Sequence, residues 1–168
     1  EVIYNLGMDE FDLPDNCFVV YQGSHGDRGA HRADVVLPSA CYTEEAGIFL
    51  NTEGRAQLAL RANFPPGEAK ENWAIIRALW GRLGLGLTFN NLSELRSKMT
   101  TEFPNVGKLN QIVKPTWVKS SFEGFVDNSS FKPYYQNFYK TNPIARASKI
   151  MNELAKQADG NNKILAAE

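Results

Sequence analysis

The sequence predicts an α/β fold, in the form of a core fragment that continues into an extended C-terminal arm. Two apolar, β-branched runs, residues 18–21 and 33–38, have the composition of short buried strands. A glycine-rich loop at residues 23–29 separates them. A helical repeat follows, because Trp73, Ile76, Trp80 and Leu83 recur at intervals of three and four residues. Short strands, a glycine loop and an amphipathic helix together are typical of an α/β layer.

Local composition predicts the remaining strands. Residues 1–8 form a strand that ends at a glycine, and residues 47–52 form another that turns at Gly54. Pro38 ends the strand at 33–38, because proline has no N–H to donate to a neighbouring strand.

The strongest helix signal covers residues 73–83. A Pro-Pro-Gly turn at 65–67 precedes it, and Gly84 and Gly86 follow its last turn. Its apolar stripe needs a partner surface, which we expect to be the sheet. Burial of the stripe predicts that Trp73→Ala costs about 3–5 kcal/mol.

A second helix is predicted to begin at Asn91. Asn91 is a good N-cap, and Glu94 stands at the position that completes a capping box. Leu92, Leu95 and Met99 then share one face of this helix.

The chain divides into three parts. Residues 1–100 form the α/β core fragment. Residues 101–143 carry prolines and many aromatic side chains, and predict an extended connection that lies on a partner surface. Residues 144–168 form a C-terminal helix and tail, the helix covering 144–158 and ending at 159–162.

Composition narrows the functional classes. A chain of 168 residues with 43% hydrophobic and 22% charged residues is globular, and would bury about 68–70% of its unfolded surface if it folded alone. A net charge of −1 argues against a nucleic-acid partner. No apolar run reaches the roughly 18 residues of a membrane-spanning helix, and no signal peptide is visible. Because the first residue is Glu1, we expect a processed product or a piece of a longer protein.

The two cysteines, Cys17 and Cys41, limit metal chemistry. An iron–sulfur cluster requires four thiolates, and a cysteine-rich zinc site also requires more than two. A disulfide between them is possible, but nothing in the sequence supports it.

The glycine loop is the first candidate site. Gly23, Gly26 and Gly29 follow a strand, as phosphate-binding loops do. Their spacing differs from G-x-G-x-x-G, and the sequence that follows reads as a strand rather than a helix. A tight structural loop is therefore favoured over nucleotide binding.

The same loop contains a possible metal site. His25 and His31 lie near Asp27 and Asp34, and these are residue types that bind zinc or iron. The histidines do not have the i, i+4 spacing of a helical metal motif, and the chain has no third histidine. Surface or capping roles are favoured.

Nucleophilic catalysis has little support. Ser24 is not in a G-x-S-x-G elbow, and neighbouring side chains in a strand point apart, so His25 is not expected to activate it. Cys41 has an apolar setting, whereas a reactive thiolate requires an electropositive one.

Acidic and aromatic residues also have structural interpretations. Glu44, Glu45 and Glu53 could form a carboxylate pair, but a hydrogen-bonded turn is favoured, in which Glu53 pairs with Arg55. The aromatic run predicts packing or interface anchors rather than nucleic-acid stacking. Its members are Trp117, Phe122, Phe125, Phe131, Tyr134, Tyr135, Phe138 and Tyr139.

Several blocks resemble the C-terminal part of the large iron–sulfur (75-kDa) subunit of respiratory complex I, NADH:ubiquinone oxidoreductase. They are residues 27–38, the Tyr-Thr-Glu at 42–44, the segment Asn-Thr-Glu-Gly-Arg-Ala-Gln at 51–57, and residues 71–73, 75–79, 137–139 and 144–149. The likeness is weak between about Gly107 and Tyr134.

The resemblance implies a fragment of a molybdopterin-oxidoreductase-like domain that has lost its pterin cofactor. It implies a non-catalytic structural part of the peripheral arm of complex I, on the matrix side of the mitochondrial inner membrane. This chain would hold no cofactor, catalytic residue or metal, and would not span the membrane. Iron–sulfur clusters, FMN and NADH would bind elsewhere in the proton-translocating complex.

The partners implied are other complex I subunits, especially the cluster-bearing N-terminal part of the large iron–sulfur subunit. Two alternatives remain open. One is the cap region of an active molybdopterin oxidoreductase of the formate dehydrogenase kind, in which residues 24–28 would touch the pterin. The other is a freestanding α/β module that binds an anion at the glycine loop. The sequence assigns no role to His25, Arg28 or Cys41.

Overall fold

The structure is a computed structural model that describes residues 1–10, 12–119, 124–125, 127–131 and 137–165. Its centre is a parallel sheet with strand order β1-β2-β3. The strands are β1 (Val2–Leu6), β2 (Phe18–Gly23) and β3 (Val35–Pro38). Val2 pairs with Phe18, and Val20 pairs with Val35. These are the strands that the apolar runs predict, and β3 ends at the predicted proline.

A short helix, α1 (Arg28–Arg32), connects β2 to β3. Its backbone bonds include one from the His31 N–H to the Asp27 carbonyl oxygen, at 3.1 Å. The expectation that the glycine loop leads directly into a strand is therefore wrong. Five residues make little more than one turn, which is too short to give a helical repeat in the sequence.

The predicted strand at 47–52 is the first half of a hairpin. It forms β4 (Gly47–Leu50), which pairs antiparallel with β5 (Ala56–Ala59) in a separate sheet. Gly54 takes a φ of +79° in the turn, as predicted for a glycine there. The side chain of Asn51 accepts bonds from the N–H groups of Glu53 (3.1 Å) and Arg55 (3.0 Å). The strand β5 was not predicted.

The two predicted middle helices are present as α2 (Asn72–Arg82) and α3 (Leu92–Glu102). The capping box is confirmed: the Glu94 N–H donates to Asn91 Oδ1 at 2.9 Å, and Asn91 Nδ2 donates to Glu94 Oε1 at 2.8 Å. Neither helix contains a buried residue. The stripe of α2 faces α3 more than it faces the sheet, so the expectation that the sheet buries it is wrong.

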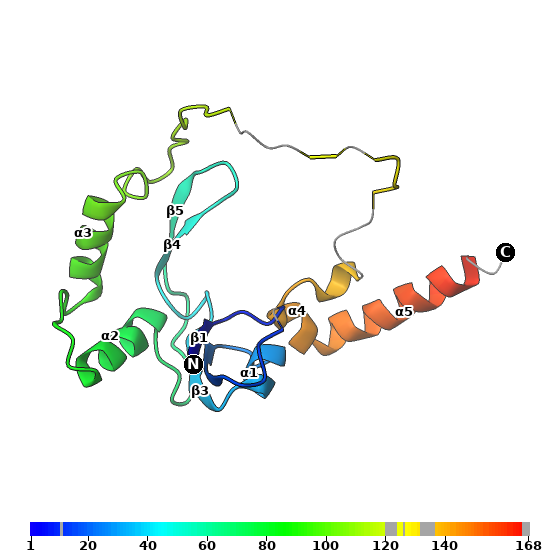
Figure 1. Cartoon of the computed structure of the whole chain (residues 1–168), viewed down its shortest axis with the longest axis horizontal. Helices are drawn as coiled ribbons and strands as arrows, with labels where there is room; N and C mark the ends of the chain where they lie inside the picture. The colour runs from blue at the N-terminus through cyan, green and yellow to red at the C-terminus, as the bar shows by residue number, and fades with distance from the viewer. Residues whose placement is uncertain (11, 120–123, 126, 132–136, 166–168) are drawn as a thin grey trace.

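The predicted C-terminal helix is two helices, α4 (Pro143–Ala147) and α5 (Lys149–Leu165), preceded by the 3₁₀ turn η1 (Phe138–Lys140). Ser148 is extended and separates them. Its side chain also accepts a bond from the Met151 N–H at 3.3 Å, which starts α5. The helix then continues through residues 159–162, where it was predicted to end. In Figure 1, α4 and α5 lie on the opposite side of the strands from α2 and α3.

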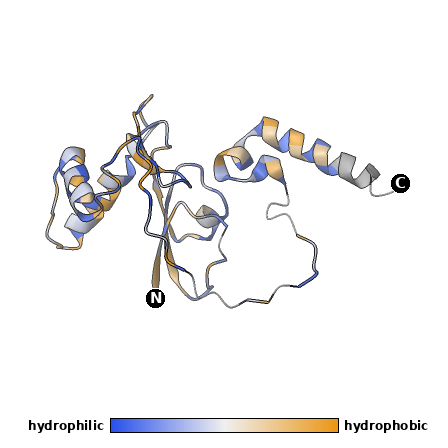
Figure 2. Cartoon of the chain, turned by 90° about the horizontal axis from the view of Figure 1, so that it is seen from above, coloured by the Kyte–Doolittle hydropathy of each residue, from blue (hydrophilic) through white to orange (hydrophobic). Residues whose placement is uncertain are grey.

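The buried core is small. Its largest fully buried side chains are Tyr21, Gln22, Val19 and Asp9. The accessible surface is 13561 Å², whereas a compact protein of 18.8 kDa has about 8,300 Å². The chain buries about half of its unfolded surface rather than the 68–70% expected of a protein that folds alone. Figure 2 shows hydrophobic residues along the strands and on α5. No helix in the described part of the chain is long and apolar enough to cross a membrane.

Candidate functional site

A cleft of about 440 Å³ opens at the carboxyl ends of β1, β2 and β3. This edge of a parallel sheet is where α/β proteins bind ligands. The glycine loop, the segment after β3, the hairpin, the start of α2 and α4 all contribute to its walls. The residues that line it are Leu6, Gly7, Asp9, Tyr21, Gln22, Gly23, Ser24, His25, Ser39, Ala40, Cys41, Tyr42, Glu45, Phe49, Asn72, Pro143 and Ile144.

A chain of polar contacts forms one wall of the cleft. Gln22 is fully buried, and its Nε2 donates to Asn72 Oδ1 at 2.7 Å. The Tyr4 hydroxyl donates to the Gln22 side-chain oxygen. Asn72 in turn donates to the Glu45 carboxylate from its backbone N–H (3.0 Å) and its Nδ2 (2.7 Å). These contacts tie β1, β2, the loop before β4 and the start of α2 together.

Asp9 forms a second buried group beneath the glycine loop. It is 1% exposed. One carboxylate oxygen accepts the Gly29 N–H at 3.0 Å, and the other accepts the Tyr21 hydroxyl at 3.3 Å. Burial, followed by the nearby Asp9 carboxylate, raises the pKa of Tyr21 to about 12. Asp9 therefore holds α1 against β2.

Arg146 of α4 fastens the C-terminal arm to the rim of the cleft. It pairs with Asp27 in the glycine loop and with Glu10 at 2.7 Å, and its Nη1 donates to the Lys140 carbonyl at 3.0 Å. The hydrogen bond from Arg146 lowers the pKa of Glu10. Pro143 and Ile144, on the same short helix, line the cleft. Sequence reasoning did not single out Arg146, because its partners lie 119 and 136 residues away.

The glycines of the loop have structural roles. Gly26 has a φ of +52°. A Cβ at Gly29 would lie 2.5 Å from the Met8 carbonyl oxygen and 2.8 Å from Tyr21 Cε2. Both positions therefore require glycine for backbone reasons, independent of any phosphate.

The possible metal ligands do not come together. Asp27 pairs with Arg146, and Asp34 accepts the Val19 N–H at 2.7 Å. His25 borders the cleft, whereas His31 is exposed on α1. Within the residues that the structure describes, no group of three His, Cys, Asp or Glu side chains could hold a metal ion.

Ser24 and His25 do touch, contrary to the sequence argument. Ser24 Oγ lies 2.8 Å from His25 Nδ1, because the two residues belong to a loop rather than a strand. In the described part of the chain, no carboxylate hydrogen-bonds to His25 to orient its ring. A serine–histidine pair lacking that third group is not a triad.

The cysteines are both free. Cys17 is buried and Cys41 is half-buried. The Cys17 thiol donates to the Pro14 carbonyl oxygen at 2.9 Å. Cys41 lines the cleft together with Ser24 and His25.

The carboxylates act as hydrogen-bond acceptors and ion-pair partners. Glu44 accepts the Cys41 N–H at 2.9 Å, while Glu45 holds Asn72. Glu53 pairs with Arg55 at 3.4 Å, which confirms the predicted pair. None of these contacts brings two carboxylates together as an acid–base pair.

The described members of the aromatic run are largely exposed. Trp117 is 89% exposed, and Phe125 and Phe131 are fully exposed. Phe138 and Tyr139 meet edge to face, with ring centroids 6.0 Å apart. Phe122, Tyr134 and Tyr135 lie outside the described residues. An interface role for this run stays a prediction.

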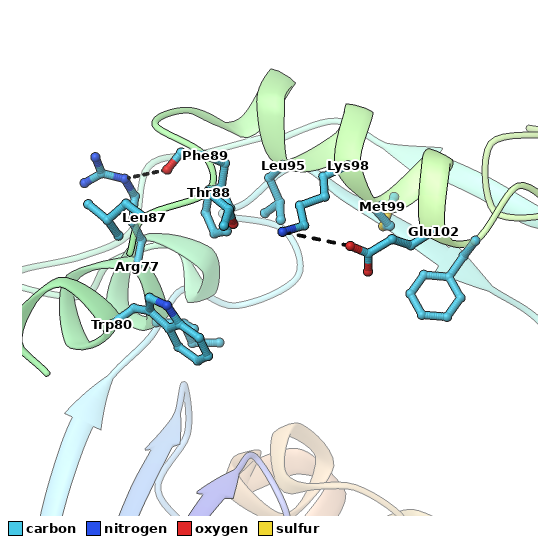
Figure 3. Close-up of a pocket in the computed structure, with 11 residues that line it drawn as sticks. Arg77, Trp80, Leu87, Thr88, Phe89, Leu95, Lys98, Met99 and Glu102 are labelled. Carbon is cyan, nitrogen blue, oxygen red and sulfur yellow. Dashed lines mark hydrogen bonds and ion pairs between the residues drawn. The ribbon is translucent and has the colours of Figure 1, made fainter. Parts of the chain in front are cut away.

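A second, apolar cavity of about 380 Å³ lies between α2 and α3 (Figure 3). Trp80, Leu95 and Met99 line it, and Arg77 Nε donates to the Phe89 carbonyl oxygen at 3.2 Å across its rim. Trp80 remains 47% exposed. The cavity is the partly filled interior of a two-helix unit.

Two family models match the chain in order. The model described as molybdopterin oxidoreductase matches residues 1–82. A model of the C-terminal region of an NADH-ubiquinone oxidoreductase component matches residues 111–154. The second match covers most of the stretch between Gly107 and Tyr134, so the expectation of a weak likeness there is wrong. The parallel sheet and the first match define the class: the chain contains part of a molybdopterin-oxidoreductase-like α/β domain.

The similar proteins specify the family. The chain is 42% identical over 155 residues to "NADH dehydrogenase [ubiquinone] iron-sulfur protein 1, mitochondrial" of Solanum tuberosum, covering 89% of the chain and 21% of that relative. It is 40% identical over 160 residues to "NADH-ubiquinone oxidoreductase 78 kDa subunit, mitochondrial" of Neurospora crassa, covering 89% and 22%. It is 41% identical over 154 residues to "NADH-ubiquinone oxidoreductase 75 kDa subunit" of Reclinomonas americana, covering 89% and 22%.

The resemblance is thus confirmed: the chain is homologous to the C-terminal part of the large iron–sulfur subunit of complex I. It spans about a fifth of the length of these relatives.

Proposed function

We propose that this chain is a non-catalytic structural part of the peripheral arm of respiratory complex I. It completes the large iron–sulfur subunit and so supports electron transfer from NADH to ubiquinone. The observation that carries the proposal is the identity of about 40% to complex I subunits over nine-tenths of the chain.

The chemistry of the cleft is consistent with a structural role. Asp9, Gln22 and Asn72 are engaged with one another's elements, and the Arg146 contacts hold α4 at the rim. Iron–sulfur clusters, FMN and NADH then bind in other parts of the complex. The nearest partner in this proposal is the cluster-bearing N-terminal part of the large subunit. The chain lies on the matrix side of the mitochondrial inner membrane.

The test is a native-gel separation of solubilised mitochondrial membranes, with in-gel staining for NADH dehydrogenase and mass spectrometry of the bands. We expect peptides of this chain to peak in the very large NADH-oxidising band at one copy per complex. Migration alone or in a small assembly would refute the proposal.

The names of the relatives do not favour the cap region of a formate dehydrogenase-like enzyme. Elemental analysis of the purified assembly distinguishes the two functions. Stoichiometric molybdenum or tungsten bound through this chain would support the enzyme instead.

A further inference from the structure

The two faces of the parallel sheet differ in how they are covered. On one face, Val19, Tyr21 and Asn5 lie beneath α1 and the loop that contains Asp9, and are 0%, 2% and 6% exposed. The register places the other side chains in three rows on the opposite face. We call this the open sheet face, and its residues are Val2 and Phe18; Tyr4, Val20 and Val35; and Leu6, Gln22 and Leu37.

The open sheet face is apolar and accessible. Val2 is 72% exposed, Leu6 50% and Phe18 48%. Gln22 is the one fully buried member, and its amide is held by Asn72 at the start of α2. None of the eight side chains is charged. Such a surface is larger and more uniform than the scattered apolar residues of an ordinary protein surface.

Sheet topology indicates what covers this face. Parallel sheets occur with helices packed on both faces, and their strands are apolar on both sides for that reason. This chain supplies α1 for one face. A second copy of the chain is a poor occupant, because two parallel sheets would then pack directly against each other without the helical layer that parallel sheets require.

We infer that the open sheet face is the docking surface for amphipathic helices of the remaining part of the large iron–sulfur subunit. This inference rests on the proposed function. The relatives have about four-fifths of their length outside the region that matches this chain, so that part contains ample sequence for a helical layer. The absence of charge on the face requires a partner with an apolar stripe. The chain's excess surface of roughly 5,000 Å² is more than a standard interface buries.

The test uses site-specific photo-crosslinking in the assembled complex. The photoreactive amino acid p-benzoylphenylalanine replaces Phe18 in one variant and Phe64 in the control. Phe64 is 71% exposed, lies outside the sheet and stacks on Arg61, so the substitution is chemically matched. A second variant places the photoreactive residue at Val2, at the edge of the face, where no buried packing is disturbed.

We expect Phe18 and Val2 variants to crosslink to a helical, apolar-striped segment of the remaining large-subunit region, several-fold more than the Phe64 variant does. Crosslinks from both positions to a second copy or to a different subunit would overturn the inference. So would an absence of crosslinks at both positions in assembled complex, because the face would then be open to solvent.

The native-gel result separates this inference from the proposed function. If the chain migrates in the NADH-oxidising band but its open sheet face crosslinks elsewhere, only the inference fails. If the chain does not enter that band, the proposed function and the inference fail together.

Discussion

Gly29 shows how a single residue determines the packing of α1. Its backbone lies so close to β2 that an added Cβ would meet the Met8 carbonyl oxygen and the Tyr21 ring at 2.5 and 2.8 Å. Its N–H is also held by the buried Asp9 carboxylate at 3.0 Å. The position therefore requires both a missing side chain and an aspartate from the preceding loop.

We predict that Gly29→Ala destabilises the chain by about 1–3 kcal/mol, because backbone atoms cannot move aside cheaply. The measurement is the urea midpoint of unfolding, followed by circular dichroism. Gly86→Ala is the control, since no atom lies within 4 Å of a Cβ there. Equal midpoints for the two variants would contradict the prediction.

Tyr21 predicts a loss of stability in alkali. Burial and the Asp9 carboxylate raise its pKa from 10.0 to about 12 in the folded chain. The unfolded chain therefore releases this proton first, so stability contributed by the neutral hydroxyl is complete below pH 10 and falls as pH rises towards 12. Tyr21→Phe, compared with the unchanged protein by unfolding at about pH 8 to 12, should flatten that decline. An unchanged slope would refute the assignment.

At the scale of elements, α3 is the helix whose start was predicted correctly. The cap and the box residue lie in the same short stretch of chain, so local sequence was sufficient to define them. We predict that Asn91→Ala lowers the free energy of unfolding by about 1 kcal/mol. Ser93→Ala, on the exposed surface of the same helix, should not lower it. Unfolding midpoints of the two variants decide between a working cap and a passive one.

The structure changes the expectation for α2. Trp73 is half-buried rather than buried, in contact with the α3 side of the molecule. We therefore expect Trp73→Ala to cost about 1–2 kcal/mol in the chain by itself, below the roughly 3–5 kcal/mol that the helical repeat predicts. Equilibrium unfolding measures this directly, and a loss above about 3 kcal/mol would mean that the stripe is buried after all.

For the whole molecule, Arg146 joins the C-terminal arm to the sheet. Its side chain is 23% exposed and that of Asp27 is 25% exposed, so the pair is partly shielded from water. We predict that Arg146→Ala costs about 1–3 kcal/mol, because Asp27 loses its partner. Amide hydrogen exchange should become faster in α4 and α5.

Arg28→Ala provides the matched control. Arg28 also pairs with an aspartate, Asp12, but the two side chains are 65% and 94% exposed. Exposed pairs contribute little, so exchange in α4 and α5 should not change. Similar effects of the two variants would show that the Arg146 pair is not what holds the arm.

The sequence by itself determined the features that depend on neighbouring residues. It located β1 to β4, the turn at Gly54, the capping box of α3 and the family, because apolar runs, glycines and caps act over a few residues. It also excluded the simplest metal and nucleophile motifs by spacing. It missed α1 and β5, since elements of five and four residues carry too little pattern.

Only the tertiary structure decided what depends on distant residues. The Gln22–Asn72 contact joins positions 50 apart, and Arg146 reaches back 119 residues to Asp27. The break at Ser148 and the continuation of α5 depend on hydrogen bonds rather than on composition. The open sheet face likewise follows from register and coverage. An apolar strand residue reads the same in the sequence whether its own chain buries it or leaves it for a partner.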